Sequence, residues 1–242
     1  MATHDLSEAF ERFTAYILKS PVKEHIVKII LFGSQAKATA TKDSDIDVLI
    51  FTSNGKTTNQ RVMDDVYDFM LKEPLPFEVV TAHIDELIAV QDYFLYTALH
   101  SGIEVYSMEK SDVKKIMIRD LLHLCEEYLD SSKDALAIQR VRMAIDAAYN
   151  AAELATKALI LLEQDDLPGS HGGVVNIFSQ LYIKTGKIEK EIGSTLHKAL
   201  KLRNEARYRP DTMPISENAR FVIDLAEQLM KIASDATLPL SG

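Results

Sequence analysis

The sequence has very little cysteine and no long apolar run, and both absences exclude classes of protein. Its single cysteine, Cys125, allows no internal disulfide and no cysteine-based metal cluster. The apolar runs fall far short of the roughly 18 residues that a membrane-spanning helix needs. The first residues also lack the apolar segment of a signal peptide. We therefore expect a cytoplasmic protein with no membrane partner.

Basic residues are outnumbered by acidic ones. The 242 residues carry a formal net charge of −9, and 47% of them are hydrophobic, which is ordinary for a globular protein. The chain is long enough for one large or two modest domains. Its negative charge disfavours non-specific adhesion of the whole chain to nucleic acid or to an anionic membrane, but it allows a local basic site.

The residue pattern changes near position 108. Before it, strand-like runs over 25–32, 46–52, 77–82 and 103–106 alternate with helical patterns, one of them over 84–100. After it, helical patterns follow one another without a convincing strand. We predict an α+β chain, with a small mixed β-sheet domain over 1–108 and an all-α helical bundle over 109–242.

An alanine-rich helix is predicted over 132–163. Its small side chains at helical spacing, over 144–158, allow another helix to approach closely. That neighbour is either a helix of the same bundle or the same face of a second copy. A homodimer is the expected assembly.

Two aspartates open the second strand-like run. Asp45 and Asp47 are two positions apart, so on a strand their side chains project to the same face. Carboxylates this close repel each other unless a cation lies between them. Their hard oxygen ligands suit Mg²⁺, which also binds substrate phosphates. The pair predicts a divalent-metal site, although an isolated pair of this kind is also common at solvated strand ends.

A glycine and a serine end the preceding strand-like run. Gly33 allows the backbone to turn sharply and to approach a ligand closely. Ser34 begins a short stretch of good helix propensity, and a helix N-terminus favours phosphate. Lys37 and Lys42 add positive charge nearby. We expect Gly33, Ser34, Lys37 and Lys42 to bind the phosphates of a nucleotide.

The two motifs follow each other in a fixed order: a strand, Gly33-Ser34, a short helix, Asp45-Ile46-Asp47 and a second strand. This order resembles the signature of the DNA-polymerase-β-like nucleotidyltransferases, above all the small minimal members. The resemblance implies that Asp45 and Asp47 bind catalytic Mg²⁺ or Mn²⁺ and that ATP is the substrate. It also implies a third acidic residue on a later strand. Glu78, in the run over 77–82, is the candidate for that ligand or for the base.

The second half of the chain resembles a HEPN domain, a helical bundle often fused to a minimal nucleotidyltransferase. The resemblance rests on His171-Gly172-Gly173, Phe178 and the run over 202–208. Many HEPN domains are ribonucleases that use an arginine and, a few residues later, a histidine. Here Tyr208 stands at the histidine position. Because tyrosine is a poor general base at neutral pH, we do not expect ribonuclease activity.

Basic residues cluster in the same region, where Arg203, Asn204, Arg207 and Tyr208 form a candidate HEPN site. Arg203 and Arg207 are four residues apart and share a helix face. They could hold phosphate, RNA or part of a substrate. Alternatively, they pair with an acidic residue such as Asp146 or Glu153 on an ordinary solvated helix face.

These features predict a metal-dependent nucleotidyltransferase that moves AMP from ATP to an acceptor, with the helical domain positioning the acceptor or the nucleotide. The acceptor is left open. One class is a protein or RNA, as in toxin–antitoxin systems, where Tyr208 would be a candidate self-target. A second class is a small molecule such as an aminoglycoside. A third interpretation is a non-catalytic module that binds nucleotide or RNA.

Overall fold

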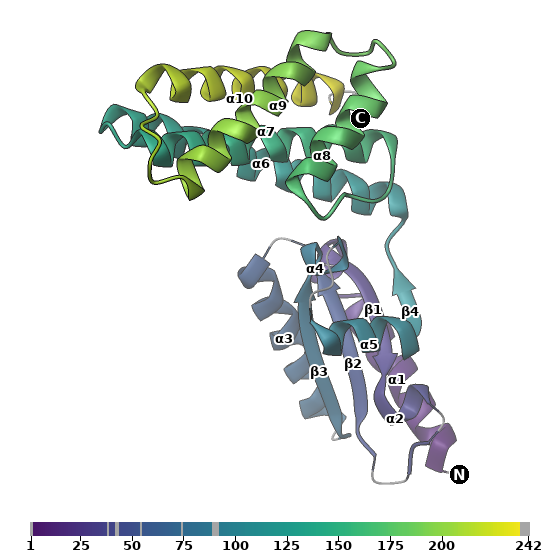
Figure 1. Cartoon of the computed structure of the whole chain (residues 1–242). Helices are drawn as coiled ribbons and strands as arrows, with labels where there is room; N and C mark the ends of the chain where they lie inside the picture. Colours follow the sequence, from purple (N-terminus) through teal and green to yellow (C-terminus); the bar gives the residue numbers. More distant parts are fainter. Residues whose placement is uncertain are drawn as a thin grey trace. The chain divides into compact units, whose positions relative to one another are not determined.

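The chain folds into two compact units, Met1–Val113 and Lys114–Gly242. The computed structural model describes residues 2–37, 39–41, 44–53, 55–73, 75–88 and 92–237. The first unit contains a mixed β-sheet and the second is helical (Figure 1). The predicted α+β class, with a small mixed sheet followed by a helical region, is confirmed.

The sheet of the first unit has the strand order β3-β2-β1-β4. β1 runs antiparallel to both of its neighbours, whereas β2 and β3 are parallel. The strands agree to within one residue with the four predicted runs. Their bounds are Ile26–Phe32 for β1, Ile46–Thr52 for β2, Phe77–His83 for β3 and Ile103–Ser107 for β4.

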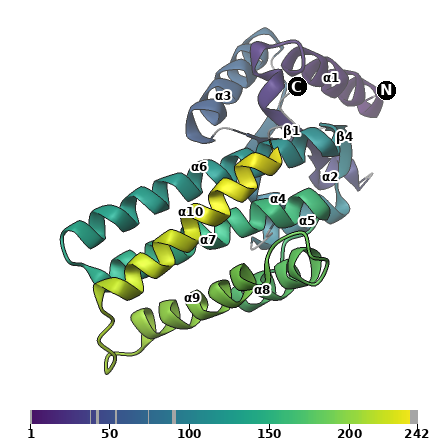
Figure 2. The same ribbon diagram turned by 90° about the horizontal axis from the view of Figure 1, so that it is seen from above.

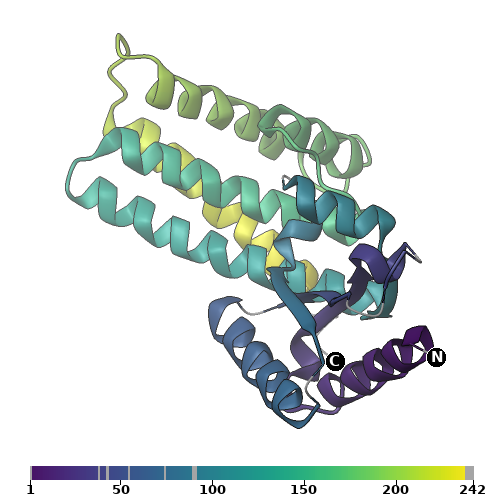
Figure 3. The same cartoon turned by 90° about the horizontal axis from the view of Figure 1, so that it is seen from below.

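Two helices, α1 (Ala2–Ile17) and α3 (Gly55–Lys72), cover one face of this sheet. They lie side by side on it in two further views (Figures 2 and 3). Their apolar side chains share a core with alternate strand residues, among them Ile46, Val48 and Ile50 of β2. Because side chains alternate along a strand, the residues between these, including Asp47, project to the opposite face.

The opposite face is covered in part by α5 (Tyr93–Ser101), which packs against β1. The helix comes so close that a β-carbon on Gly102 would lie 2.4 Å from Cγ2 of Ile30. The single helix predicted over 84–100 is wrong, because the structure has a short α4 (Asp85–Ile88) followed by α5. β1 is preceded by a 3₁₀ turn (Pro21–His25) and followed by a further short helix, α2 (Gly33–Ala36).

The second unit is a bundle in which α6, α7, α9 and α10 lie alongside one another (Figure 2). In the described part of the chain, no helix is long and apolar enough to cross a membrane. The bounds are Lys110–Ala137 for α6, Val141–Glu163 for α7, His171–Phe178 for α8, Lys190–Tyr208 for α9 and Ser216–Thr237 for α10, with a π-helical turn at Ser179–Ile183.

The alanine-rich segment belongs to α7, which packs chiefly against α10 and α9. Six of its alanines over 144–158 are fully buried inside the unit, and Ala147 is half-buried. This face is therefore part of the bundle core and not a free dimer surface. The predicted start at residue 132 is also wrong. α6 continues to Ala137, and Gln139, with a φ of 59°, turns the chain into α7 without a glycine or proline.

Candidate functional site

Three acidic residues lie near one another at one end of the sheet, and two of them, Asp47 and Glu78, project from the face opposite α1 and α3. Asp47 on β2 is in register with Glu78 on β3, so their side chains share a face. Asp45 lies two residues before Asp47 and is exposed, as is Glu78. Burial raises the pKa of Asp47 above its ordinary value, and the negative charges of Glu78 and Asp45 raise it further. The structure thus brings together the three acids identified in the sequence.

Gly33 lies directly against Asp47. Its φ of +69° is in the left-handed region, and a β-carbon there would lie 1.9 Å from Oδ2 of Asp47. The backbone N–H of Ser34 donates to the Asp47 carboxylate and lowers the pKa of that group, which partly opposes the rise. The turn after β1 therefore fixes the position of the carboxylate.

Of the two lysines expected near the phosphates, only one lies in the part of the chain that the structure describes. Lys37 follows the single turn of α2 and is exposed. Lys42 lies outside the described residues. The backbone N–H of Ser34 donates to Asp47. This amide therefore positions the carboxylate, in addition to any contact that the turn makes with a ligand.

The chemistry of the three acids suits a divalent cation. Carboxylate oxygens are the ligands that Mg²⁺ and Mn²⁺ prefer. Burial is the main cause of the raised pKa of Asp47, and the repulsion from Glu78 and Asp45 that adds to it would be relieved by a cation placed among the three acids. Over the described residues, no three acidic, histidine or cysteine groups are close enough to hold an ion by themselves. A cation here would complete its ligand set with water or with the phosphates of a substrate.

The second unit holds a separate polar cluster between α7 and α9. Arg203 is only 4% exposed, and its Nε donates to Oδ1 of Asp146 at 3.1 Å. Nη1 of Arg207 lies 3.4 Å from the same oxygen. Asn204 accepts a hydrogen bond from Nη1 of Arg203 at 3.2 Å. The pairing with Asp146 that the sequence left open is therefore present, and both arginines are engaged by it.

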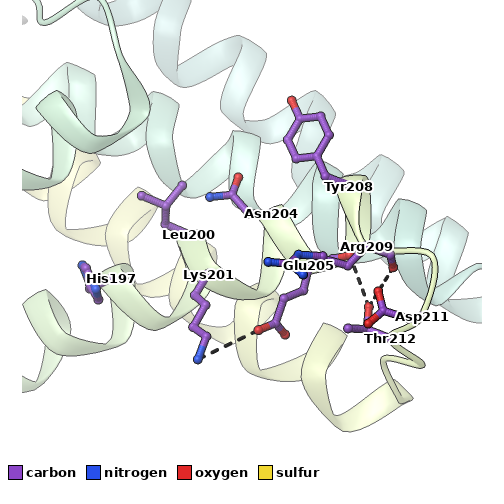
Figure 4. A pocket seen from close by; sticks show the side chains of 9 residues that line it. All are labelled: His197, Leu200, Lys201, Asn204, Glu205, Tyr208, Arg209, Asp211 and Thr212. Carbon is purple, nitrogen blue, oxygen red and sulfur yellow. Dashed lines mark hydrogen bonds and ion pairs between the residues drawn. The ribbon is translucent and has the colours of Figure 1, made fainter.

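Tyr208 lies at the end of α9 and is 64% exposed. The guanidinium carbons of Arg203 and Arg207 lie 5.7 Å and 5.8 Å from the centre of its ring. Tyr208 and Asn204 border an open groove of about 810 Å³ along α9 (Figure 4). Of the four residues proposed for a HEPN site, these two line the groove, whereas the arginines are directed to Asp146.

The role of Arg142 was not predicted from the sequence. Its guanidinium donates to the backbone carbonyls of Ala206 at 2.6 Å and Arg209 at 3.0 Å, and also to that of Thr212. The last carbonyls of a helix have no partner within the helix. Arg142, on α7, therefore supplies the missing donors at the end of α9.

A buried carboxylate, Glu153, pairs with His171 across the bundle. Glu153 is 6% exposed and accepts a hydrogen bond from Nδ1 of His171. It also forms an ion pair with Nζ of Lys157, at 2.9 Å. Burial by itself would raise the pKa of Glu153, but the hydrogen bonds from Lys157 and His171 outweigh it and hold the pKa below its ordinary value. His171, at the start of α8, therefore ties that helix to α7.

Two family models match the chain. One describes a nucleotidyltransferase domain and matches residues 15–119. The other describes a HEPN domain and matches residues 118–236. The two matches follow each other in the order that the sequence motifs predicted.

Two relatives are at least 30% identical to parts of the chain. A protein of Methanocaldococcus jannaschii named as a putative toxin is 32% identical over 113 residues, which make up 47% of this chain and 83% of that protein. A UPF0332 protein of Thermotoga maritima is 30% identical over 82 residues, or 34% of this chain and 61% of that protein.

A solved structure can be aligned with nearly the whole chain, but the sequence identity and the structural similarity are low. It is a spectinomycin adenyltransferase from Enterococcus faecialis with ATP and spectinomycin. The match covers 93% of this chain and 99% of that one, with 14% identity and a TM-score of 0.34. A similarity this small carries no argument about what the present chain binds.

Proposed function

This chain belongs to the nucleotidyltransferase family through its first domain and to the HEPN family through its second, and we propose that it transfers AMP from ATP to an acceptor. One observation carries the proposal. Asp47 is held by the turn at Gly33 and Ser34, and its partial burial and the charges of Glu78 and Asp45 beside it raise its pKa. Such a cluster is unfavourable in isolation and suits a cation-bound triphosphate.

Asp45, Asp47 and Glu78 would hold Mg²⁺ or Mn²⁺ in this proposal. Bound there, the ion would neutralise phosphate charge and activate the acceptor hydroxyl. Gly33 and Ser34 position the Asp47 carboxylate, and we assign Gly33, Ser34, Lys37 and Lys42 to the phosphates. The exposed Glu78 serves as the third ligand or accepts the proton of the hydroxyl.

The proposed reaction is a single displacement at the α-phosphorus. The acceptor's hydroxyl oxygen forms a bond to that phosphorus as the bond to the oxygen bridging the α- and β-phosphates breaks. Pyrophosphate leaves with the electron pair of the broken bond, and the hydroxyl proton passes to a base. Catalysis of this kind depends mostly on positioning and on charge stabilisation.

We propose a protein or RNA acceptor first, because a relative of the chain is named as a putative toxin. Tyr208 offers a hydroxyl of its own, since it is exposed at the end of α9. Self-modification at Tyr208 is therefore the first acceptor to test. We do not propose ribonuclease activity for the HEPN domain, whose role here is to position the acceptor or the nucleotide. The small-molecule acceptor and the non-catalytic module are alternative outcomes of the same test.

The experiment incubates the whole protein with ATP and Mg²⁺ and measures its intact mass and the pyrophosphate released. We expect an added AMP on the wild type and none on Asp47→Asn. Asp68→Asn is the matched control, because Asp68 is exposed on α3, against the other face of the sheet. Loss of the modification in the single variant Tyr208→Phe would identify Tyr208 as the acceptor.

Each other result has a defined meaning. Pyrophosphate released only when an aminoglycoside is added indicates a small-molecule acceptor. Nucleotide binding without any turnover indicates the non-catalytic module. Equal transfer by the wild type and by Asp47→Asn would remove the proposed active site.

The homodimer expected from the sequence is part of the same proposal. Exposed apolar side chains, including Met143 and Met213, border a groove at one end of the bundle. Light scattering of the whole protein measures the assembly directly, and a monomer at all concentrations would remove this part of the proposal.

A further inference from the structure

An aromatic pair lies beside the carboxylate cluster, on the same face of the sheet. Phe32, the last residue of β1, is in register with Asp47 on β2. The ring of Phe94, from α5, packs edge-on against the ring of Phe32, with centroids 5.2 Å apart and an interplanar angle of 83°. Phe94 is nevertheless 42% exposed. An exposed aromatic surface therefore begins one strand away from Asp47.

The start of α5 holds Phe94 in place. Oδ1 of Asp92 accepts hydrogen bonds from the backbone N–H groups of Phe94 at 2.7 Å and of Leu95 at 3.1 Å, which caps the helix. Leu95 and Ala98 are buried, and α5 packs against β1 (Figure 1). Because the helix is anchored at its start and along its buried side, the position of the Phe94 ring is set by the fold.

From this arrangement we infer that Phe94 stacks on the base of the nucleotide whose phosphates lie at Asp47. The inference rests on the proposed function, which places the triphosphate there. The base is the flat, π-bearing part of a nucleoside triphosphate, and aromatic side chains bind bases by stacking on them. Two other rings of α5 are exposed: Tyr93 at the first position of the helix, and Tyr96, which is stacked on His100 with ring centroids 4.0 Å apart. Phe94 contacts the strand residue that is paired with Asp47.

A consequence follows for base preference. Stacking uses the face of a base, which all four bases possess, and needs no hydrogen bond to its edge. We therefore expect Mg²⁺-dependent affinities for ATP and GTP that differ by less than about tenfold, an expectation that follows from stacking alone. Both should bind more tightly than inorganic tripolyphosphate, which has no base to stack.

The absence of tryptophan from the sequence gives a direct test. In Phe94→Trp, the introduced side chain is the sole tryptophan, and its fluorescence should be quenched by ATP with Mg²⁺ but not by tripolyphosphate with Mg²⁺. Tyr67→Trp is the matched control, because Tyr67 is 63% exposed on α3, the helix against the other face. Its fluorescence should not respond to ATP.

Calorimetry supplies the second measurement. Phe94→Ala should raise the Kd for ATP roughly 5- to 150-fold, the range for loss of one base stack. It should leave the Kd for tripolyphosphate unchanged. If Phe94→Ala does not fold by circular dichroism, the fluorescence of Phe94→Trp still decides the question.

The outcomes separate this inference from the proposed function. An unchanged Kd for ATP in a folded Phe94→Ala, or no quenching in Phe94→Trp, overturns the stacking role. If Asp47→Asn loses Mg²⁺-dependent ATP binding in the same experiments, the nucleotidyl-transfer site stands without it. A wild type that binds neither ATP nor tripolyphosphate overturns both.

Discussion

The backbone of Gly33 lies so close to the carboxylate of Asp47 that a β-carbon on Gly33 would lie 1.9 Å from Oδ2 of Asp47. The antiparallel pairing of Phe32 with Asp47 brings the two residues together at the end of the sheet. Two separate reasons therefore require glycine at position 33: the positive φ, and the space that the Asp47 carboxylate occupies.

Replacement of Gly33 by alanine should abolish nucleotide binding. The added methyl group displaces the Asp47 carboxylate, which we assign to the cation and the phosphates. Gly186→Ala separates this effect from backbone strain, because Gly186 has a similar φ of +74° and nothing lies within 4 Å of an added β-carbon. Both variants carry the cost of a left-handed alanine, about 1–2 kcal/mol.

Titration calorimetry with ATP and Mg²⁺ measures the difference between the two glycine variants. Gly186→Ala should keep the wild-type Kd, and Gly33→Ala should show no measurable binding while remaining folded by circular dichroism. A wild-type Kd in Gly33→Ala would mean that the position of Asp47 does not matter for the nucleotide.

The charge of Asp47 should make the first domain less stable as the pH rises. The pKa of this group in the folded protein is raised above the ordinary value of 3.8. The folded state therefore holds the proton more tightly than the unfolded state does. The free energy of unfolding should fall as the pH rises from about 3.8 through the raised pKa and should then level off. Asp47→Asn lacks this titration, so its stability relative to the wild type should increase over the same interval.

Urea unfolding at a series of pH values, without divalent cations, measures this change. Asp68→Asn is again the control, because it makes the same substitution on α3, against the other face of the sheet. Mg²⁺ should stabilise the wild type more than Asp47→Asn, because a cation that binds the folded state raises its stability. A pH-independent difference between Asp47→Asn and the wild type would contradict the raised pKa of Asp47.

The core of the carboxylate site could be predicted from the sequence because local geometry fixes it. Asp45 and Asp47 flank the core residue Ile46 at the start of β2, and Gly33 directly follows the end of the neighbouring β1. Glu78 was harder to assign, since its place beside Asp47 depends on the parallel pairing of β2 with β3. Phe94 was missed, because its contact with Phe32 depends on where α5 packs on the sheet.

In the helical domain, the sequence predicted helices better than their boundaries or polar contacts. The turn at Gln139 has no glycine or proline to mark it, so the last residues of α6 were assigned to the helix predicted over 132–163. The contacts of Arg142 with the end of α9 join residues more than 60 positions apart. Helical periodicity identifies a buried face, but it does not say which distant group will satisfy a buried charge.

The pairing of Glu153 with His171 should make the helical domain sensitive to acid. The pKa of Glu153 is held below its ordinary value of 4.5, so the carboxylate stabilises the folded state above that pH. This contribution should be lost as the pH falls through the lowered pKa. At neutral pH, Glu153→Gln should lower the free energy of unfolding of this domain by about 1–3 kcal/mol, because His171 and Lys157 lose a charged acceptor that is itself buried.

A second histidine–glutamate pair in the same domain provides the control for Glu153→Gln. His123 and Glu127 lie 3.4 Å apart on α6, and both side chains are exposed. Because exposed ion pairs contribute little, Glu127→Gln should leave the unfolding curve nearly unchanged. Urea unfolding followed by helical circular dichroism compares the two variants at neutral and acidic pH. The wild type and Glu153→Gln should converge in acid. Equal effects of the two substitutions would mean that burial does not strengthen the Glu153 pair.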